Sequence, residues 1–438
     1  MKEDAYGLPV STQSDTALRA YMRDLDRLLS MDDGGTPLFG DAIAADGNFA
    51  LAHIAQARHL ILLGRVDDAR AVAARASALD AGLHDRERAH VAAVALAING
   101  QAAAALDAVR RHVAAYPTDP LVLSLALGVY GLIAFSGRRD HHREQRDLLE
   151  ELAPKWPEHW WFLGFLGWSH AETGEPEAGG RIVDRSLALN GRNAQAVHAR
   201  MHAYVELGDQ DKGAAFLEAW LRDYKPGNML HCHLNWHMAL FELDQGKPDS
   251  AFARYMSCIR PGVVAAAGFP KLADAASLLW RMQAYGALPD PLPWREVADM
   301  AIQVFPRAGL TFADLHAAMA CAAAGDSEAL ERRIDELDQA LASGKLRQGE
   351  IVPALCRALG AYVRGEDAEV IRLIDGALPE LPRVAGSHAQ REVFEDTLIS
   401  ACLRAKRTDR ARELLTRRLA RRPRRQDAKW LETLEASL

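Results

Sequence analysis

The sequence is poor in cysteine, in basic charge and in long hydrophobic runs, and each shortage argues against a class of protein. Five cysteines, odd in number and without a Cys-x-x-Cys pair, predict reduced thiols in a cytoplasmic protein. The net charge of −7 lacks the basic field that draws proteins to polyphosphate, so no nucleic acid partner is expected. No stretch of about 18 apolar residues occurs, and the first residues lack a signal sequence, so no membrane partner and no secretion are expected.

Motifs of nucleotide and serine chemistry are missing as well. The chain has no Gly-x-Gly-x-x-Gly after a strand, no Gly-x-x-x-x-Gly-Lys-Ser/Thr phosphate loop and no Gly-x-Ser-x-Gly elbow. Nucleotide binding and serine hydrolysis are therefore disfavoured. The sequence leaves open whether the protein is an enzyme.

Helical patterning dominates what is present. Hydrophobic residues make up 49% of the chain and charged residues 25%, the balance of an ordinary folded protein. Apolar residues recur at helical spacing, whereas the alternating β-branched runs of strands are almost absent. Since 438 residues exceed what one compact core supports, we expect several domains or one elongated repeat array.

The breaks between the apolar helices recur at a regular distance, which favours the array. Consecutive breaks lie 34 to 40 residues apart, close to the tetratricopeptide period of about 34 residues. Glycine at a helix end permits the left-handed conformation, and a small residue shortly after it lets two helices approach. The pattern predicts nine or ten stacked hairpins in an all-α, tetratricopeptide-like α-solenoid with a right-handed superhelix. The breaks fall at Gly64, Gly100, Gly137, Gly174, Gly208, Gly246, Gly286, Gly325 and Gly365, with Lys406 in the last equivalent place.

The repeat array is expected to span residues 46–415. Residues 1–45 form an N-terminal arm, in which an extended segment leads to a helix capped at Ser14 or Asp15. Residues 416–438 form a basic C-terminal capping helix, because terminal repeats must cover their apolar ends. The proline-rich stretch 260–295 predicts an irregular unit with longer loops.

Histidine and tryptophan gather on one side of the predicted array. Aligning the units on their turn glycines assigns the concave face of each first helix. One helix presents His198 and His202 there, four residues apart, and the next presents His233, Trp236 and His237. The same alignment places these further residues inside: His90, Trp161, Trp168, Ser277, Trp280 and His316.

Three interpretations of these rings are open. The rings pack in the core with backbone partners for their nitrogens, or they line a binding pocket, which is the simpler account because each buried polar ring needs several partners. In the third interpretation, the two histidine pairs share an ion, for which i, i+4 spacing is suited. A divalent metal is a possible cofactor that the sequence does not favour. No His-Glu-x-x-His motif occurs, and nothing in the spacing requires Asp274 or Asp314 to orient the ligands.

Two segments near the C-terminus carry arginine. In the segment 386–391, glycine and serine are expected to stop one helix and cap the next, so that Gln390 and Arg391 fall in its first turn. Backbone N–H groups there favour an anion, and the Arg391 guanidinium suits a carboxylate or phosphate. Pairing with Glu395 is the alternative. The run 417–425 is interpreted as a solvated helix end that complements the helix dipole.

With these residues, the chain resembles the proteins grouped as tetratricopeptide repeat protein 38, which have bacterial members. The resemblance runs over most of the chain and implies the repeat fold, but no activity. It makes the inner histidines a family feature. The specific motifs are Cys232-His233-x-x-Trp236-His237 and Gly386-Ser387-x-Ala389-Gln390-Arg391. Weaker matches are Leu8-Pro9, Arg86-Glu87 with His90, His198-x-x-x-His202, Asp274 with Ser277, Arg281 and Gln283, and Asp314-x-His316.

Two functions follow as hypotheses. The first is a binding protein that takes a small polar or anionic ligand, or a peptide tail, into the concave groove. The second is an enzyme that uses the inner histidines as acid, base or metal ligand on a small anionic substrate. Dissimilar titratable groups from distant units favour a closed small-molecule site over a long peptide groove. The sequence does not set the oligomeric state.

The candidate residues divide between these roles. The ligand-binding set is His90, Trp236, Asp274, Ser277, Trp280, Arg281, Asp314, Gln390 and Arg391. The set for acid, base or metal-ligand roles is His198, His202, His233, His237 and His316.

Overall fold

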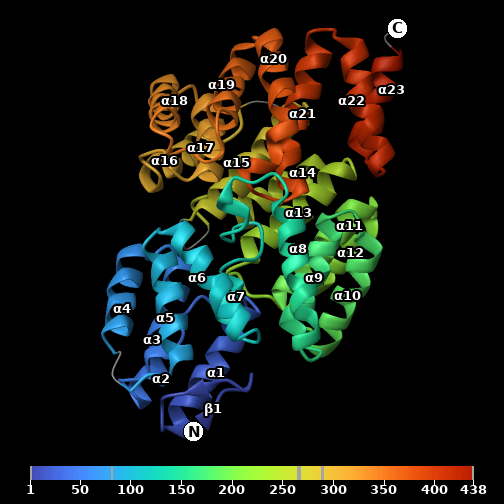
Figure 1. Cartoon of the computed structure of the whole chain (residues 1–438). Helices are drawn as coiled ribbons and strands as arrows, with labels where there is room; N and C mark the ends of the chain where they lie inside the picture. Colours follow the sequence, from blue (N-terminus) through green and yellow to red (C-terminus); the bar gives the residue numbers. More distant parts are fainter. Residues whose placement is uncertain (1, 80–81, 264–267, 288–290, 437–438) are drawn as a thin grey trace. The chain divides into compact units, whose positions relative to one another are not determined.

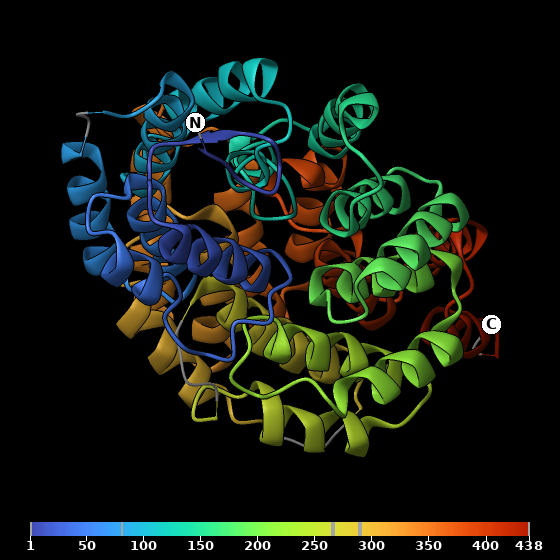
Figure 2. The same ribbon diagram turned by 90° about the horizontal axis from the view of Figure 1, so that it is seen from below.

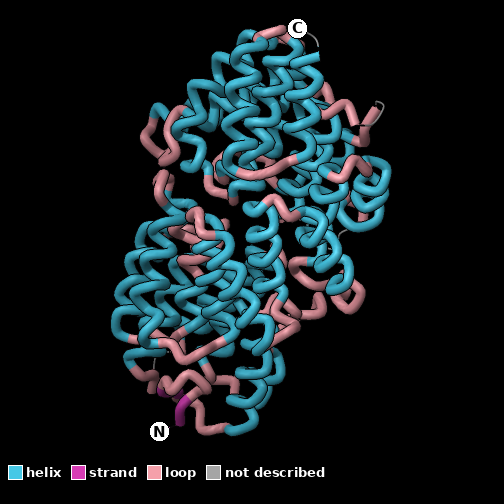
Figure 3. The backbone as a smooth tube through the Cα atoms, turned by 90° about the vertical axis from the view of Figure 1, so that its right-hand side faces the viewer, coloured by secondary structure: helices cyan, strands magenta, loops and turns pink. Residues whose placement is uncertain are grey.

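Helix is the main secondary structure in the computed structural model, which describes residues 2–79, 82–263, 268–287 and 291–436. Figure 3 shows helices joined by loops throughout the tube, with strand confined to the region near the N-terminus. The strands of the described residues are β1 (Lys2–Glu3) and β2 (Pro9–Val10), paired antiparallel. The predicted all-α fold is confirmed. None of the described helices is both long enough and apolar enough to cross a membrane.

The helices belong to two compact units. The first unit comprises the residues up to 136 together with 140–200 and 224–230. Its helices are α1 (Asp15–Leu29), α2 (Gly40–Ala45), α3 (Ala50–Leu62), α4 (Val66–Ala78), α5 (Asp85–Ile98), α6 (Ala102–Ala115), α7 (Pro120–Ser124), α8 (His141–Leu152), α9 (Trp160–Glu172) and α10 (Pro176–Leu189), with the 3₁₀ turns η1 (Ala134–Ser136) and η2 (Ala153–Lys155).

The second unit comprises residues 137–139 and 201–223 and the chain from 231 onward. Helix α11 (Ala194–Leu207) begins in the first unit and ends in the second. The other elements of the second unit are α12 (Gln210–Leu221), α13 (His231–Asp244), α14 (Pro248–Arg254), the π-helical turn η3 (Tyr255–Ile259), α15 (Phe269–Ala284), α16 (Trp294–Val304), α17 (Thr311–Ala323), α18 (Ser327–Ala342), α19 (Ile351–Arg364), α20 (Asp367–Ala377), η4 (Leu378–Val384), α21 (His388–Arg404), α22 (Thr408–Arg421) and α23 (Arg425–Ala436).

Consecutive helices pair into hairpins, as the glycine spacing predicts. In Figure 1 the partners of several hairpins, such as α3 with α4 and α19 with α20, lie side by side. The described residues contain nine such pairs, which agrees with the nine or ten predicted and makes the fold a tetratricopeptide-like α-solenoid. The pairs are α3/α4, α5/α6, α9/α10, α11/α12, α13/α14, α15/α16, α17/α18, α19/α20 and α21/α22.

The predicted break residues share one backbone conformation. All nine glycines have a positive φ, from 58° at Gly286 to 92° at Gly174. Lys406, in the tenth place, adopts a φ of 55° without being glycine. At Gly208 the next residue closes the helix end, because the Asp209 N–H donates to the Tyr204 carbonyl at 3.0 Å. This bond satisfies a helix-terminal carbonyl and turns the chain towards the next helix.

Small residues after the turns allow the two helices of a hairpin to approach closely. Helices α9 and α10 run side by side in two views (Figures 1 and 2). A Cβ added to Gly179 would lie 2.5 Å from the Gly167 carbonyl oxygen, so only glycine fits at this crossing. The alanines at the corresponding positions, Ala69 and Ala105, are fully buried.

One predicted helix is not formed. The stretch that ends at Gly137 was expected to be a continuous first helix, but α7 stops at Ser124 and a loop leads to the short turn η1. Gly128 adopts a φ of 82°, and a Cβ on Gly131 would lie 2.3 Å from the Leu127 carbonyl oxygen. The backbone therefore folds back on itself where the prediction placed helix.

The terminal segments agree with the sequence in their local structure. Ser14 caps α1, since its side chain accepts a hydrogen bond from the Ala17 N–H at 3.2 Å. Of the proline-rich stretch 260–295, residues 264–267 and 288–290 lie outside the described residues, and α15 fills much of the remainder. The boundaries expected at residues 45 and 415 stay predictions; α2 ends at Ala45, and α22 runs through position 415.

Candidate functional site

Three of the predicted histidines meet inside the second unit. His202 lies on α11, and His233 and His237 lie one turn apart on α13. The ring centroids of His202 and His237 are 4.9 Å apart, and those of His233 and His237 are 4.8 Å apart. Each ring offers one nitrogen, and these nitrogens lie within 4.8 Å of one another. The approach of the two helices, expected because adjacent units place equivalent positions side by side, is thus found.

The three rings are almost completely removed from solvent. Their residues are 1%, 7% and 0% exposed for His202, His233 and His237, respectively. His198 precedes His202 by one turn of α11, in the part of that helix that belongs to the first unit. The i, i+4 spacing read from the sequence therefore places His198 and His202 on one helix face.

A carboxylate from a third helix orients this group. Asp274 on α15 is 1% exposed, and its Oδ1 lies 2.8 Å from the His233 Nδ1. An ionised carboxylate only accepts, so the proton is on Nδ1 and the Nε2 lone pair of His233 points away from Asp274. The neighbouring Cys232 thiol also bonds to Asp274, and its burial raises its pKa well above the usual value.

Trp236 and Arg281 form a layer next to the three histidines, which we call the tryptophan layer. The Trp236 indole stacks on the His233 ring at 5.2 Å between centroids and donates its N–H to the Ser277 hydroxyl at 3.1 Å. The Arg281 guanidinium lies 5.6 Å from the Trp236 ring and donates to the Ala389 carbonyl at 2.6 Å. Arg281 therefore ties α13 and α15 to the first turn of α21.

The segment 386–391 adopts the predicted cap. Ser387 begins α21 with a capping box, in which its side chain accepts from the Gln390 N–H and the Gln390 side chain accepts from the Ser387 N–H. Arg391 is 5% exposed and donates to the Gly386 carbonyl at the start of its own helix. Trp280 reaches the same helix further along, where its indole N–H donates to the Thr397 hydroxyl at 2.8 Å.

His316 and Asp314 lie on α17 in contacts of their own. The His316 Nδ1 donates to the Phe312 carbonyl at 2.7 Å, and burial, aided by the nearby Arg281 charge, lowers the pKa of His316 to about 4. Asp314 binds the Arg333 guanidinium of α18 and accepts from the Gly309 N–H at 3.0 Å. Burial raises the Asp314 pKa.

His90 belongs to a separate cluster in the first unit. The Asp119 Oδ2 lies 2.8 Å from the His90 Nδ1 and 3.0 Å from the His112 Nε2. The same oxygen lies 2.8 Å from the Arg86 guanidinium, and these positive and donor groups hold the Asp119 pKa well below its usual range despite burial. His112 and Asp119 were not foreseen as site residues from the sequence; Asp119 precedes Pro120 and caps the start of α7, a signal that was not used.

The other predicted tryptophans also lie in the first unit. The Trp161 ring lies 5.5 Å from the Trp156 ring, and the Trp168 ring lies 5.4 Å from the His142 ring. Both tryptophans are 1% exposed. They pack within the first unit's core.

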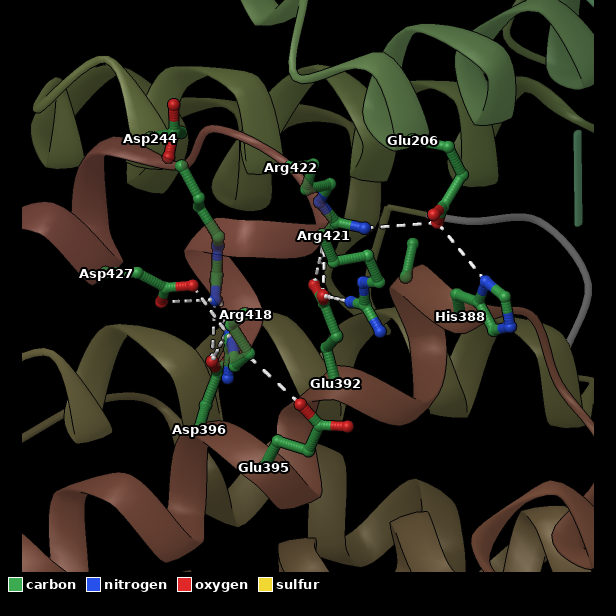
Figure 4. A network of polar contacts seen from close by, with 12 residues as sticks. Glu206, Asp244, His388, Glu392, Glu395, Asp396, Arg418, Arg421, Arg422 and Asp427 are labelled. Carbon is green, nitrogen blue, oxygen red and sulfur yellow. Dashed lines mark hydrogen bonds and ion pairs between the residues drawn. The ribbon is translucent and has the colours of Figure 1, made fainter. Parts of the chain in front are cut away.

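The basic run near the C-terminus is not a solvated helix end, which corrects the expectation. Arg418 and Arg422 are 3% and 5% exposed. Figure 4 shows Arg422 between Glu206 and Glu392, at 3.1 Å and 2.6 Å. Arg418 binds Asp396 at 2.8 Å. Arg418 and Arg422 are buried because α22 packs against α21, which brings the carboxylates of α21 to them, whereas Arg417, Arg421 and Arg425 of the same run are exposed.

A pocket opens beside this ion-pair network. It lies between α13, α15, α21 and the connection from α22 to α23, and Arg281 is common to the pocket and the tryptophan layer. The lining includes Leu240, Asp244, Arg281, Tyr285, Ala389, Glu392, Arg422 and Arg424. Of these residues, only Arg281 was predicted from the sequence to bind a ligand, because the convergence of the others depends on residues far apart in the chain.

These features define an all-α helical-repeat protein of the tetratricopeptide kind with a polar, buried site in its second unit. No protein-family model matches the chain. Solved structures similar to it include the crystal structure of yeast Tom70, at 12% identity and a TM-score of 0.34 over 96% of this chain and 95% of that one. The tetratricopeptide domain of P58(IPK) is similar at 15% identity and a TM-score of 0.23 over 90% of each chain.

Proposed function

We propose that the chain is a ligand-binding helical-repeat protein whose second unit takes a small anionic molecule. The observation that carries this proposal is the pocket between α13, α15 and α21, which is lined by Arg281, Arg422 and Arg424. A guanidinium presents a planar pair of donors that matches a carboxylate or a phosphate. Three such groups beside one pocket supply both charge and orientation.

The charge balance of the lining supports an anion. Two carboxyl groups, Asp244 and Glu392, also line the pocket. Burial raises the pKa of Asp244 and so weakens its charge, whereas the neighbouring arginines lower the pKa of Glu392 to about 2. Three arginines and two carboxyl groups therefore line the pocket, and Arg422 and Arg424 also pair with Glu206 and Asp396.

A small molecule is favoured over a peptide tail. The lining comes from the sides of several helices that converge on one place, whereas a peptide groove repeats similar residues along many units. Tyr285 adds a phenol that donates to Asp396 at 2.7 Å, which holds its ring at the wall of the pocket. The assignment to the tetratricopeptide repeat protein 38 family, a bacterial source and a cytoplasmic location belong to the same proposal.

The pair formed by Asp274 and His233 favours a second candidate, an enzyme that acts on the bound anion. A carboxylate that holds the imidazole Nδ1–H makes the opposite nitrogen more basic, as acid–base catalysis requires. The enzymatic reading predicts consumption of a bound ligand by the wild-type protein and none by His233→Gln. If every ligand that binds is recovered unchanged, the enzymatic candidate fails and the binding protein stands.

The proposal is tested by thermal unfolding and calorimetry with succinate, citrate and orthophosphate as probes. A ligand at about 100 times its Kd stabilises the folded state by about 2.7 kcal/mol, so the melting temperature of the wild-type protein should rise by several degrees. Arg422→Gln should abolish the rise, because this side chain lines the pocket.

Arg418→Gln is the matched control. Arg418 is equally buried in the same ion-pair network, but it is not among the pocket residues. Both variants should lose stability, whereas only Arg422→Gln should lose the anion. Equal anion binding by the two variants, or a response of neither the wild type nor the variants to any probe, would refute the pocket assignment.

A further inference from the structure

Three buried imidazoles and one buried carboxylate lie close together in the second unit. His202, His233 and His237 come from two helices, and each of these residues is buried. Their nitrogens lie within 4.8 Å of one another. Imidazole nitrogens that converge from two helices, with a carboxylate bonded to one ring, have the arrangement of a metal-binding group.

We propose that His202, His233 and His237 bind a divalent transition metal of the zinc type. In a tetrahedral site with metal–nitrogen bonds of about 2.1 Å, the ligand nitrogens lie roughly 3.4 Å apart. The observed upper limit of 4.8 Å leaves a short closure, which small rotations of the imidazoles about their side-chain bonds supply.

Asp274 supplies the support that a metal-binding histidine normally has. A histidine that binds a metal through one nitrogen almost always donates its other N–H to a carboxylate or carbonyl, which fixes the ring and raises its basicity. The Asp274 Oδ1 lies 2.8 Å from the His233 Nδ1, so Nε2 is the nitrogen that we assign to the ion. One reason for disfavouring a metal from the sequence was that nothing in the spacing required Asp274 to orient a ligand, and in the structure Asp274 bonds to His233.

The second unit is a better metal site than the cluster in the first unit. There, His90, His112 and Arg86 all direct their donors at one oxygen of Asp119. A metal would have to displace these hydrogen bonds and sit beside a permanent guanidinium charge. At His202, His233 and His237, by contrast, the Asp274 carboxylate bonds to one proposed ligand, His233.

The ligand type sets the class of ion. Neutral imidazoles suit zinc, copper, nickel and iron, whereas calcium and magnesium require oxygen ligands. Cys232 precedes His233, but its buried thiol bonds to Asp274 and is not part of the proposed ligand set. The expected complex is therefore nitrogen-ligated without thiolate.

The metal site adds to the proposed function and rests on that function for its role. The test of the metal site does not depend on the proposed function. Metal content is measured without an added anion, and anion binding by Arg422→Gln is measured on metal-free protein. A negative result for metal binding leaves the anion-binding result unchanged, and the reverse also holds. The two proposals can therefore fail separately.

The decisive experiment measures metal binding by the full chain. The purified protein is stripped with a chelator, exposed to Zn²⁺ alone and analysed for bound metal, and Co²⁺ is used as a spectroscopic probe of ligand type and geometry. One Zn²⁺ per chain should bind, and Co²⁺ should give the visible spectrum of a tetrahedral complex without a thiolate charge-transfer band. Sub-stoichiometric zinc, or a thiolate band, would overturn the proposal.

Three variants locate the ion. His233→Gln should abolish stoichiometric binding, and Asp274→Asn, which keeps the shape and a hydrogen-bond acceptor, should weaken affinity by about 10- to 100-fold. His316→Gln is the matched control, a buried histidine of the same unit bonded to the Phe312 carbonyl, and should bind zinc like the wild type. Far-UV circular dichroism shows whether each variant is folded.

If His233→Gln does not fold, Asp274→Asn and the cobalt spectrum decide the question. Unchanged affinity in Asp274→Asn overturns the assignment. Loss of zinc from His112→Gln with full retention by His233→Gln would place the ion in the first unit, which also overturns it.

Discussion

A single buried carboxylate, that of Asp396, holds together the basic C-terminal part of the second unit. It binds Arg418 and Arg424 at 2.8 Å each and accepts from the Tyr285 hydroxyl at 2.7 Å. Arg281 lies 3.5 Å away on another helix. Buried charges of this kind are stabilising only as a set, because each one alone would face a large desolvation cost.

Replacing Asp396 with alanine should therefore destabilise the protein strongly. The substitution leaves buried guanidinium groups with too little compensating charge, which typically costs about 3–5 kcal/mol. Chemical denaturation measures the free energy of unfolding. The control is Glu369→Ala, which removes a solvent-exposed ion pair with Arg372 and should leave that free energy unchanged. Similar losses in the two variants would contradict the account of the buried network.

His316 predicts how stability depends on pH. Burial lowers its pKa in the folded state from 6.5 to about 4, so between these values the unfolded chain binds a proton that the folded chain does not. Its contribution to stability is therefore complete above about pH 6.5 and is lost as the pH falls towards 4. One proton corresponds to about 1.4 kcal/mol per pH unit. His316→Gln should reduce the slope of the free energy of unfolding by up to that amount in this window, and an unchanged slope would contradict the assignment.

Individual side-chain partners were the part least accessible from the sequence. The i, i+4 spacing placed His233 and His237 on one helix face, and the alignment of adjacent units placed His202 beside them, as the ring distances show. The partners of Arg418 could not be foreseen, since Asp396 lies on the preceding helix and a run of arginines has the same local pattern whether it is exposed or buried.

At the scale of elements, the ends of the helices carry the clearest sequence signal. A positive φ is strained for a residue with a Cβ, so glycine recurs where each hairpin turns. The signal failed before Gly137, because Gly128 and Gly131 break the expected helix from within. The spacing between breaks gives no information about glycines inside a segment. The irregular region from α7 to η1 could therefore be found only in the structure.

Lys406 and Gly365 allow a reciprocal test of this explanation. Lys406 adopts a left-handed φ of 55°, so Lys406→Gly should raise the free energy of unfolding by about 0.5–1 kcal/mol. This gain is the backbone strain that the substitution relieves, minus the conformational entropy that glycine adds to the unfolded chain. Gly365 has a φ of 75° with open space around the position of a Cβ, so Gly365→Ala should lower it by about 1 kcal/mol. Changes of the same sign in both variants would show that the turn conformation does not set these stabilities.

At the scale of the whole molecule, the chain is an all-α array whose described residues form two compact units with separate buried networks. The first unit contains the Arg86, His90, His112 and Asp119 cluster, and the second contains the network around Asp396. The repeat period predicted the helix hairpins. The period could not predict that the hairpins divide into two compact units, because contacts between repeats of equal length depend on side-chain packing and not on spacing.

Local substitutions should therefore act within their own unit. Asp119→Asn removes the charge that compensates Arg86 and should increase amide hydrogen exchange in α3 to α6, while α15 to α21 keep their protection. Asp396→Asn should do the reverse. Hydrogen exchange followed by mass spectrometry resolves both regions in one experiment. A uniform rise in exchange over all helices in either variant would mean that the chain unfolds as one cooperative body.

The central claim is that the second unit binds a small anion at the arginine-lined pocket. The most direct measurement is an anomalous difference map from crystals of the full-length protein soaked with a brominated aromatic carboxylate. The bromine peak should lie between Arg281, Arg422 and Tyr285, with the carboxylate against the guanidinium groups. Bromine peaks found only on exposed arginines, with none in this pocket, would contradict the account.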